Sequence, residues 1–254
     1  MLDQIFSGSL SAALPGTASV AGARGDAGVD AARAKFGKIP IATTTLADNL
    51  TLLSGPGGNV VVLNGGDGKL LVDTFVSSAW DGLQKALDNL GDAPLKFAID
   101  THWHWDHTDN NANVRGAGAE LIAHVNTRKR MSEPHVLEIL NYHFDPFIPA
   151  AIPQHTFKES YEMDFNGEHL TLGHMAPAHT DTDIFVHFQK ANVLHMGDVF
   201  FNGIYCYIDR GTGGKIAGVI AGSDKMLAMV DNDTKVVPGH GPLGNKADLK
   251  KYRD

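Results

Sequence analysis

The sequence predicts one α/β domain, and three observations lead to this prediction. The chain has 254 residues, of which 43% are hydrophobic, and this is enough to build one large core. From Ile41 onward, short β-branched runs alternate with stretches of helical periodicity. No change in composition divides the chain into halves. We therefore expect a domain over residues 41–254, preceded by an N-terminal extension over residues 1–40 whose Ala, Gly and Ser content is typical of a flexible segment.

The first part of this domain is expected to be an antiparallel meander. Residues 50–53, 59–64 and 69–73 have the apolar, β-branched composition of strands. The turn clusters at residues 54–58 and 65–68, which are rich in glycine, separate them.

A helix is expected next, over residues 79–90. Its apolar residues recur at helical spacing, and Gly91 ends it. The sequence then predicts a strand over residues 95–99, a helix over 110–115, a strand over 121–123 and a helical segment over 126–142.

The second half repeats the alternation of strands and helices. Strands are expected over residues 168–172, 184–188, 192–196 and 235–237, with a helix over 215–230. The polar residues that could carry chemistry follow the ends of predicted strands in both halves. Strand ends hold side chains in fixed positions while the adjoining loops stay open to a substrate.

Composition and charge exclude several classes of partner. The 21 basic and 29 acidic residues give a net charge of −8, and no basic cluster exceeds residues 128–130, so we expect no nucleic-acid partner. The single cysteine, Cys206, cannot form an internal disulfide. No apolar run approaches the ~20 residues that cross a bilayer, so we expect a soluble protein without a membrane partner. The sequence leaves open its oligomeric state and its compartment, cytoplasm or periplasm, because residues 10–23 only weakly resemble the end of an export signal.

Five histidines and two aspartates stand at spacings that suit metal binding. They are His102, His104, Asp106, His107, His179, Asp198 and His240. Imidazole nitrogens and carboxylate oxygens are the ligands that Zn²⁺ prefers where thiolates are absent. Two residues apart in extended backbone, His102 and His104 point to the same side and can meet at one ion. The sequence therefore predicts a site for two metal ions, and Zn²⁺ is the expected metal, with iron or manganese as alternatives.

These residues lie in motifs that resemble those of the metallo-β-lactamase fold superfamily. The motifs are Thr101-His-Trp-His-Trp-Asp-His107, the strand-end Asp73, Ala178-His-Thr-Asp181, Gly197-Asp198 and Pro238-Gly-His-Gly241. The resemblance runs from about Ile41 to the C-terminus. It implies an αβ/βα four-layer sandwich, in which two mixed β-sheets face each other, helices lie outside them, and a binuclear centre lies at one edge of the sheets.

The resemblance also implies a role for each of these residues. His102, His104 and His179 would bind one metal, while Asp106, His107 and His240 would bind the second. Asp198 would bridge the two ions, and Asp73 would orient a ligand imidazole by a hydrogen bond. Metal binding lowers the pKa of water from ~16 to ~7, which makes hydroxide available at neutral pH. Asp106 would orient this nucleophile and carry its proton.

The expected function is that of a zinc-dependent hydrolase that opens a cyclic amide, a lactone or a thioester of small-molecule size. β-Lactamase activity is included in this expectation. The chain departs from the zinc β-lactamases that carry cysteine at the fourth motif and lysine three residues later, because Asp198 and Phe201 stand there. Two alternatives are a mononuclear-iron persulfide dioxygenase and a glyoxalase II-like thioesterase. A binding protein without turnover is a third, and the identity of the bound metal would separate the dioxygenase from the hydrolases.

Substrate contacts are expected from the residues that follow the fourth motif. Phe200 and Phe201 come directly after the Asp198 segment, so at least one of them should border the substrate. Arg210, beside a glycine-rich loop, is the candidate that would anchor a substrate carboxylate. Aromatic residues are expected to form an apolar wall of the pocket: Phe75, Trp103, Trp105, Phe200, Phe201, Tyr205 and Tyr207.

Overall fold

A computed structural model describes residues 27–137, 142–175 and 177–254 of the chain. The segment that weakly resembles an export signal lies outside the described residues. So does most of the predicted N-terminal extension, and the predicted domain boundary at residue 41 stays a prediction. In the described part of the chain, no helix is both long enough and apolar enough to span a membrane.

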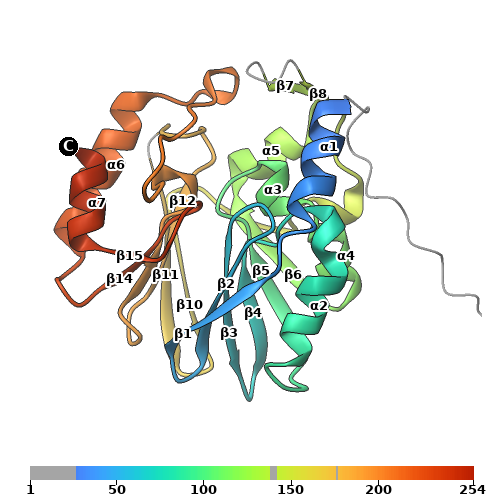
Figure 1. The fold of residues 1–254 in the computed structure, drawn as a ribbon, viewed down its shortest axis with the longest axis horizontal. Helices are drawn as coiled ribbons and strands as arrows, with labels where there is room; N and C mark the ends of the chain where they lie inside the picture. Colours follow the sequence, from blue (N-terminus) through green and yellow to red (C-terminus); the bar gives the residue numbers. More distant parts are fainter. Residues whose placement is uncertain (1–26, 138–141, 176) are drawn as a thin grey trace, which may run out of the picture.

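Two β-sheets face each other at the centre of the molecule (Figure 1). Within the described residues, the first sheet has seven strands in the order β1-β2-β3-β4-β5-β6-β9. It is mixed, because β4, β5, β6 and β9 pair in parallel while the other neighbours are antiparallel. Its strands are β1 (Ala42–Ala47), β2 (Leu50–Ser54), β3 (Asn59–Gly65), β4 (Gly68–Val72), β5 (Leu95–Ile99), β6 (Glu120–His124) and β9 (His155–Phe157).

The second sheet has six strands in the described residues, in the order β10-β11-β12-β13-β14-β15. Only β13 and β14 pair in parallel, so this sheet is also mixed. Its strands are β10 (Ser160–Phe165), β11 (Glu168–His174), β12 (Ile184–Phe188), β13 (Val193–His195), β14 (Lys235–Val237) and β15 (Gly244–Asn245).

Helices cover the outer face of each sheet (Figure 1). The first sheet carries α1 (Ala27–Phe36), α2 (Trp80–Asp88), α3 (Trp105–Thr108), α4 (Asn111–Gly116) and α5 (Val125–Ser132), and the second carries α6 (Ile216–Met229) and α7 (Lys246–Arg253). One buried apolar cluster lies between the sheets, and one lies between each sheet and its helices. The four-layer αβ/βα sandwich expected from the sequence is confirmed.

The helix predicted over residues 126–142 is wrong in its second half. The helix α5 ends at Ser132, and β7 (His135–Leu137) then pairs antiparallel with β8 (Tyr142–Phe144). Glu133 has an extended backbone with φ −123° and ψ 154°, and Pro134 follows it. A residue before proline is disfavoured in the helical region, which explains why the helix stops here.

Four strands that no prediction covered also belong to the sheets, and the shortest of them is β15 with two residues. The strand β1 is mostly exposed, so it lacks the alternation of apolar and polar residues that marks a strand in sequence. The strand β9 has only three residues, and β10 is exposed along most of its length. Such strands are stabilised by pairing with their neighbours, and the sequence shows no clear alternation of apolar and polar residues over them.

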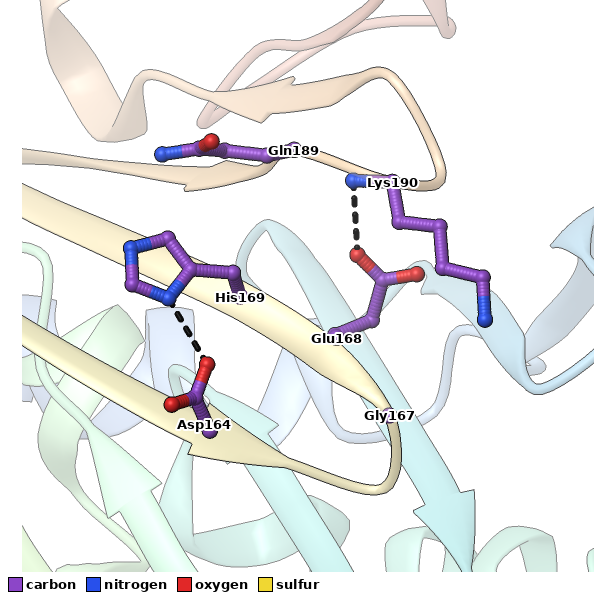
Figure 2. A pocket seen from close by; sticks show the side chains of 6 residues that line it. All are labelled: Asp164, Gly167, Glu168, His169, Gln189 and Lys190. Carbon is purple, nitrogen blue, oxygen red and sulfur yellow. Dashed lines mark hydrogen bonds and ion pairs between the residues drawn. The ribbon is translucent and has the colours of Figure 1, made fainter.

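Polar side chains form a shallow hollow where the β10–β11 turn meets the turn after β12 (Figure 2). There, His169 Nδ1 lies 2.7 Å from Asp164 Oδ1, and the backbone NH of Lys190 donates to Glu168 Oε2 over 3.1 Å. The first contact lies within the β10–β11 hairpin, and the second ties this hairpin to the turn after β12. The hollow lies at the start of β11, whereas the loop that carries His179 follows its end.

Candidate metal centre

The seven predicted ligand residues come from segments that follow strands of both sheets. His102 and His104 follow β5, and the short helix α3 carries Asp106 and His107. Residues 179, 198 and 240 follow β11, β13 and β14, respectively. Because these strand ends lie at the same edge of the sandwich, the fold brings residues up to 138 positions apart in sequence to one place.

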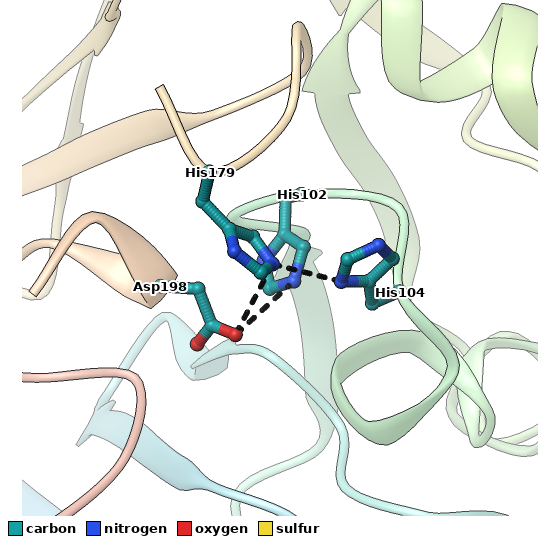
Figure 3. A group of neighbouring side chains, drawn as sticks. All are labelled: His102, His104, His179 and Asp198. Atoms are coloured by element: carbon teal, nitrogen blue, oxygen red, sulfur yellow. Dashed lines mark hydrogen bonds and ion pairs between the residues drawn. The ribbon is translucent and has the colours of Figure 1, made fainter. Parts of the chain in front are cut away.

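The first group comprises three histidines and one aspartate, all buried (Figure 3). One ligand atom from each of His102, His104, His179 and Asp198 lies within 4.8 Å of the others. His179 Nε2 lies 2.8 Å from His104 Nδ1 and 3.3 Å from Asp198 Oδ2. This group could hold one metal ion.

The second group comprises Asp106, His107 and His240, whose ligand atoms also lie within 4.8 Å of one another. His240 Nε2 lies 3.3 Å from Asp106 Oδ2 and 3.3 Å from His107 Nε2. These residues could hold a second ion beside the first.

Asp198 lies between the two groups. Its Oδ1 atom is 3.2 Å from His107 Nε2, and its Oδ2 atom is 3.4 Å from His240 Nε2. The same Oδ2 atom is 3.7 Å from His102 Nε2 in the first group. The carboxylate therefore has oxygens within reach of both groups.

Four of the histidines have one nitrogen fixed by a protein oxygen, which leaves the other nitrogen facing the cluster. Thr101 Oγ1 lies 3.1 Å from His102 Nδ1, and the carbonyl of Tyr207 lies 2.5 Å from His179 Nδ1. The other two contacts are to carboxylates: Asp209 Oδ2 is 3.1 Å from His104 Nε2, and Asp73 Oδ2 is 2.8 Å from His107 Nδ1. Such contacts select the tautomer whose free nitrogen can bind a metal.

Asp73, which the sequence predicts to orient a ligand imidazole, lies at the end of β4 and contacts His107. It accepts hydrogen bonds from the backbone NH and the hydroxyl of Thr101, both over 2.8 Å, in addition to its contact with His107. Its φ of +65° is a backbone conformation that non-glycine residues rarely adopt. The surrounding hydrogen bonds hold this strained conformation and link the end of β4 to the segment that carries His102, His104 and His107.

Asp209 was not identified from the sequence. Besides His104, it contacts Thr212, whose hydroxyl donates to Asp209 Oδ2 over 2.6 Å. The same hydroxyl accepts a hydrogen bond from Trp103 Nε1 over 3.2 Å. No motif marks this aspartate, because it contacts a histidine 105 positions away in the chain. Its position before the glycine-rich loop at residues 211–214 was the only signal.

The electrostatics of the metal-free cluster place protons on particular residues. Burial lowers the pKa of His102 well below its usual value, and the neighbouring His107 lowers it further. Burial by itself would also lower the pKa of His107. The negative charges of Asp198 and Asp106 outweigh this effect, so the pKa of His107 is raised well above 6.5. His240 has a pKa raised to about 9, because the same two carboxylates outweigh burial there.

The pKa values of the two carboxylates, Asp198 and Asp106, are lowered. Burial alone would raise the pKa of Asp198, but the charges of His240 and His107 lower it well below 3.8. The pKa of Asp106 is also lowered, because His107 and His240 outweigh its burial. The carboxylates and the histidines of the cluster thus stabilise one another's charged forms.

These imidazole and carboxylate donors fit one or two metal ions that are borderline between hard and soft. His102 Nε2 is buried without a hydrogen-bond partner among the described residues, and buried Asp198 Oδ1 has only its charged contact with His107 Nε2 at 3.2 Å. Buried polar atoms without a partner are costly, and a bound cation would satisfy both. Imidazole and carboxylate donors without thiolate are typical of Zn²⁺, and they also suit iron.

The three residues predicted to contact the substrate lie at different places relative to the candidate metal centre. The ring of Phe201 stacks on that of His240, with centroids 4.9 Å apart, so Phe201 lies beside the candidate centre. Phe200 does not: it is fully buried in the cluster under α6 and α7, where its ring meets Tyr252 at 5.3 Å. Arg210 is exposed, directly after Asp209. Its assignment to a substrate carboxylate stays a prediction.

The predicted aromatic wall is only partly present. Trp103 and Phe75 are fully buried, and Tyr205 is fully exposed. Tyr207 lies beside the centre, with its ring 6.4 Å from that of His104 and 5.9 Å from that of His179. Trp105 meets Phe36 of α1, a residue that no sequence signal had assigned to the site.

Comparison with known proteins defines the class of this chain. The sequence profile of the metallo-β-lactamase superfamily matches residues 53–240, which include all seven candidate ligands. The chain belongs to this superfamily, whose members are generally hydrolytic metalloenzymes. No curated protein matches the chain significantly.

Solved structures share this fold at low sequence identity. The DIM-1 metallo-β-lactamase is 19% identical with a TM-score of 0.68, and the match covers 85% of this chain and 97% of that one. A metallo-β-lactamase from Pontibacter korlensis is 16% identical with a TM-score of 0.69, covering 84% and 98%. The BLEG-1 B3 metallo-β-lactamase is 20% identical with a TM-score of 0.66, covering 84% and 97%. At these identities, the likeness establishes the fold alone.

Proposed function

We propose that this protein is a binuclear zinc-dependent hydrolase that opens a cyclic amide, a lactone or a thioester. The observation that carries this proposal is the pair of adjacent ligand groups, each with atoms within 4.8 Å of one another. His102, His104 and His179 would hold one ion, while Asp106, His107 and His240 would hold the other. Asp198 would contact both. Two zinc ions at this place would supply Lewis-acid activation of water and of the substrate carbonyl.

The protein's own residues would orient the reactants and move a proton. Asp106 is accessible at the edge of the cluster, with 15% of its side chain exposed, and its lowered pKa keeps it a carboxylate at neutral pH. It is therefore suited to orient the attacking water and to receive its proton at Oδ2. Asp73 and Asp209 would hold His107 and His104 in the orientations that a ligand requires.

The structure favours this hydrolase over the mononuclear-iron dioxygenase that the motifs also resemble. The second ligand group is complete, and it lies directly beside the first at the Asp198 carboxylate. A mononuclear enzyme would not need three further donors converging there. A thioesterase of the glyoxalase II type shares the two-metal chemistry and stays within the proposal.

A parallel substrate screen tests the proposal. Zinc-loaded protein is assayed with nitrocefin, a homoserine lactone and a glutathione thioester, and metal content is measured on the same sample. We expect hydrolysis of at least one of these and a loss of roughly 100-fold or more in Asp106→Asn, because a general base contributes about that factor. Asp164→Asn, at the exposed hollow of Figure 2, should keep the wild-type rate. One bound iron with oxygen uptake, or wild-type turnover by Asp106→Asn, would refute the proposal.

A further inference from the structure

The candidate metal centre is accessible from one side. Among its seven candidate ligands, His240 and Asp106 have the most exposed side chains, at 23% and 15%. The side chains of His102, His107 and His179 are at most 1% exposed. A substrate must therefore approach past His240 and Asp106.

A small cavity adjoins this open side. It has a volume of about 270 Å³ and lies between His240, the turn after β2 and the segment that follows α1. Its lining includes Phe36, Ile39, Gly57, Gly58 and His240. We call it the Phe36–Ile39 slot.

The walls of this slot are mostly apolar, and the polar side chains of Ser54 and Asn59 already have hydrogen-bond partners. The hydroxyl of Ser54 donates to Asn59 Oδ1 over 2.6 Å. The amide of Asn59 donates to the carbonyls of Pro238 and Gly241 over 2.9 Å and 3.0 Å. These bonds leave the Phe36 ring, the Ile39 side chain and the imidazole of His240 as the surfaces that a ligand would meet.

Two glycines allow the wall of the slot to lie directly against the metal centre. A Cβ on Gly57, whose φ is +106°, would lie 2.8 Å from the carbonyl oxygen of Asp106. A Cβ on Gly58 would lie 2.9 Å from the carbonyl oxygen of Gly239 and 3.0 Å from His107 Cε1. The slot is thus a direct continuation of the centre.

The helix α1 holds Phe36 firmly in place. Arg33 forms a two-pronged ion pair with buried Asp109, with N–O distances of 2.7 Å and 3.1 Å. Its guanidinium also lies 5.3 Å from the centroid of Trp105, the residue before Asp106. Phe36 stacks on the same Trp105 ring, with centroids 6.0 Å apart and planes 14° apart. This wall is therefore fixed relative to the candidate catalytic aspartate.

We propose that the Phe36–Ile39 slot binds an uncharged apolar substituent of the substrate, next to the bond that is broken. This inference rests on the proposed hydrolase function and adds a substrate class to it: lactones or cyclic amides that carry a short alkyl or phenyl group. Phe36 and Ile39 are then specificity-determining residues that lie outside the region matched by the superfamily profile. A cavity of about 150 Å³ is known to bind benzene, so a volume of about 270 Å³ accommodates a phenyl or pentyl group.

Two lactones that differ only in their substituent test this inference. The kcat/KM of zinc-loaded protein is measured for γ-nonalactone, which carries a pentyl group, and for γ-butyrolactone, which carries none. We expect a preference for γ-nonalactone that falls roughly 10-fold in Ile39→Ala and in Phe36→Ala, chiefly through KM, because lost apolar contacts cost about that factor. The kcat/KM for γ-butyrolactone, which has no substituent to place in the slot, should fall much less than that for γ-nonalactone.

Ile220→Ala is the matched control. Ile220 and Ile39 have nearly equal exposed fractions, 39% and 40%, but Ile220 lies on α6 at the other side of the molecule (Figure 1). The control should leave the lactone preference unchanged. Zinc content and melting temperature of each variant show whether a change reflects the slot or the stability of the protein.

A binding measurement separates failure of the slot from failure of the hydrolase proposal. Saturation-transfer NMR with pentan-1-ol, which cannot be hydrolysed, should give a signal with the wild type and with Ile220→Ala, and a weaker one with Ile39→Ala. If neither lactone is hydrolysed, pentan-1-ol binding decides the inference alone, while the three-substrate screen decides the proposed function. An unchanged lactone preference in both slot variants, or a wild type that gives no pentan-1-ol signal, would overturn it.

Discussion

At the scale of single residues, the orientation of each histidine decides whether the centre can hold a metal. His104 differs from the other histidines of its group, because its Nε2 contacts Asp209 and its Nδ1 faces the cluster. The protein thus uses a carboxylate to turn this ring. A neutral group in the place of Asp209 would hold the ring less firmly and make it a weaker ligand.

The variant Asp209→Asn tests this role. We expect the affinity for zinc at the His102, His104 and His179 group to fall about 10- to 100-fold, because substitutions of residues that orient ligands typically have this effect. Competition with a chromophoric chelator measures it. Asp181→Asn, which alters an ion pair with Arg130 on a neighbouring segment, is the control and should bind zinc as the wild type does. Equal affinities in both variants would show that Asp209 has no part in metal binding.

The sequence could predict which residues gather at the centre but not which residues support them. Spacing in the motif around His102 and the short motifs at residues 179, 198 and 240 pointed to seven side chains, and the structure places them in two adjacent groups. The contacts of Asp209 and of Phe36 depend on how distant loops pack. No local pattern in the chain encodes such contacts.

At the scale of elements, α1 depends on one buried ion pair. The side chains of Arg33 and Asp109 are 13% and 2% exposed, and Val29 of the same helix is buried in the core. Removing one partner of a buried pair leaves an uncompensated charge, which is strongly destabilising.

The variant Arg33→Met should therefore lower the free energy of unfolding by roughly 3 kcal/mol. Arg253→Met, which removes an exposed pair with Asp224, should change it far less, because solvent screens exposed ion pairs. Chemical denaturation of both variants provides the comparison. Similar losses in the two proteins would mean that the Arg33 pair does not anchor α1.

The start of α5 depends on the protonation of a histidine outside the centre. His124 Nδ1 accepts a hydrogen bond from the backbone NH of Asn126 over 3.2 Å, while Nε2 lies 2.8 Å from the carbonyl of Lys158. Its ring stacks on that of His174, with centroids 3.9 Å apart. Burial and the neighbouring His174 lower the pKa of His124 to about 4.

A lowered histidine pKa means that the unfolded chain binds the proton more readily than the folded one. The stabilisation is fully present above pH 6.5 and is lost as the pH falls toward 4. His124→Asn keeps an acceptor for the helix but cannot titrate in this range. Its free energy of unfolding should therefore decline less than that of the wild type between pH 6.5 and 4. Parallel declines would contradict this role for His124.

Strand prediction succeeded where burial produces a pattern and failed where it does not. The buried strands β2 to β5 and β11 to β14 have the apolar runs from which they were predicted. The exposed edge strand β1 and the β7–β8 pair lack such runs. The signal at Pro134 that ends α5 was present in the sequence and explains the failed helix.

At the scale of the whole molecule, both sheets contribute candidate ligands, so metal binding should join the two halves of the sandwich. His102 and Asp106 follow strands of the first sheet, and residues 179, 198 and 240 follow strands of the second. Any ligand that binds only the folded state stabilises it by mass action.

Removal of metal should accordingly lower the melting temperature. At zinc concentrations 1,000-fold above the dissociation constant, the stabilisation is about 4 kcal/mol, which corresponds to a shift of roughly 10 °C for a chain of this size. Differential scanning calorimetry before and after dialysis against a chelator measures the shift. Identical transitions would mean that metal does not connect the halves.

The number of zinc ions per chain tests the two-metal account most directly. Elemental analysis of zinc-equilibrated, desalted protein should find two ions in the wild type and one in the double variant Asp106→Ala and His240→Ala, whose first ligand group is intact. A wild type that retains no zinc, or a double variant that retains as much zinc as the wild type, would contradict the account.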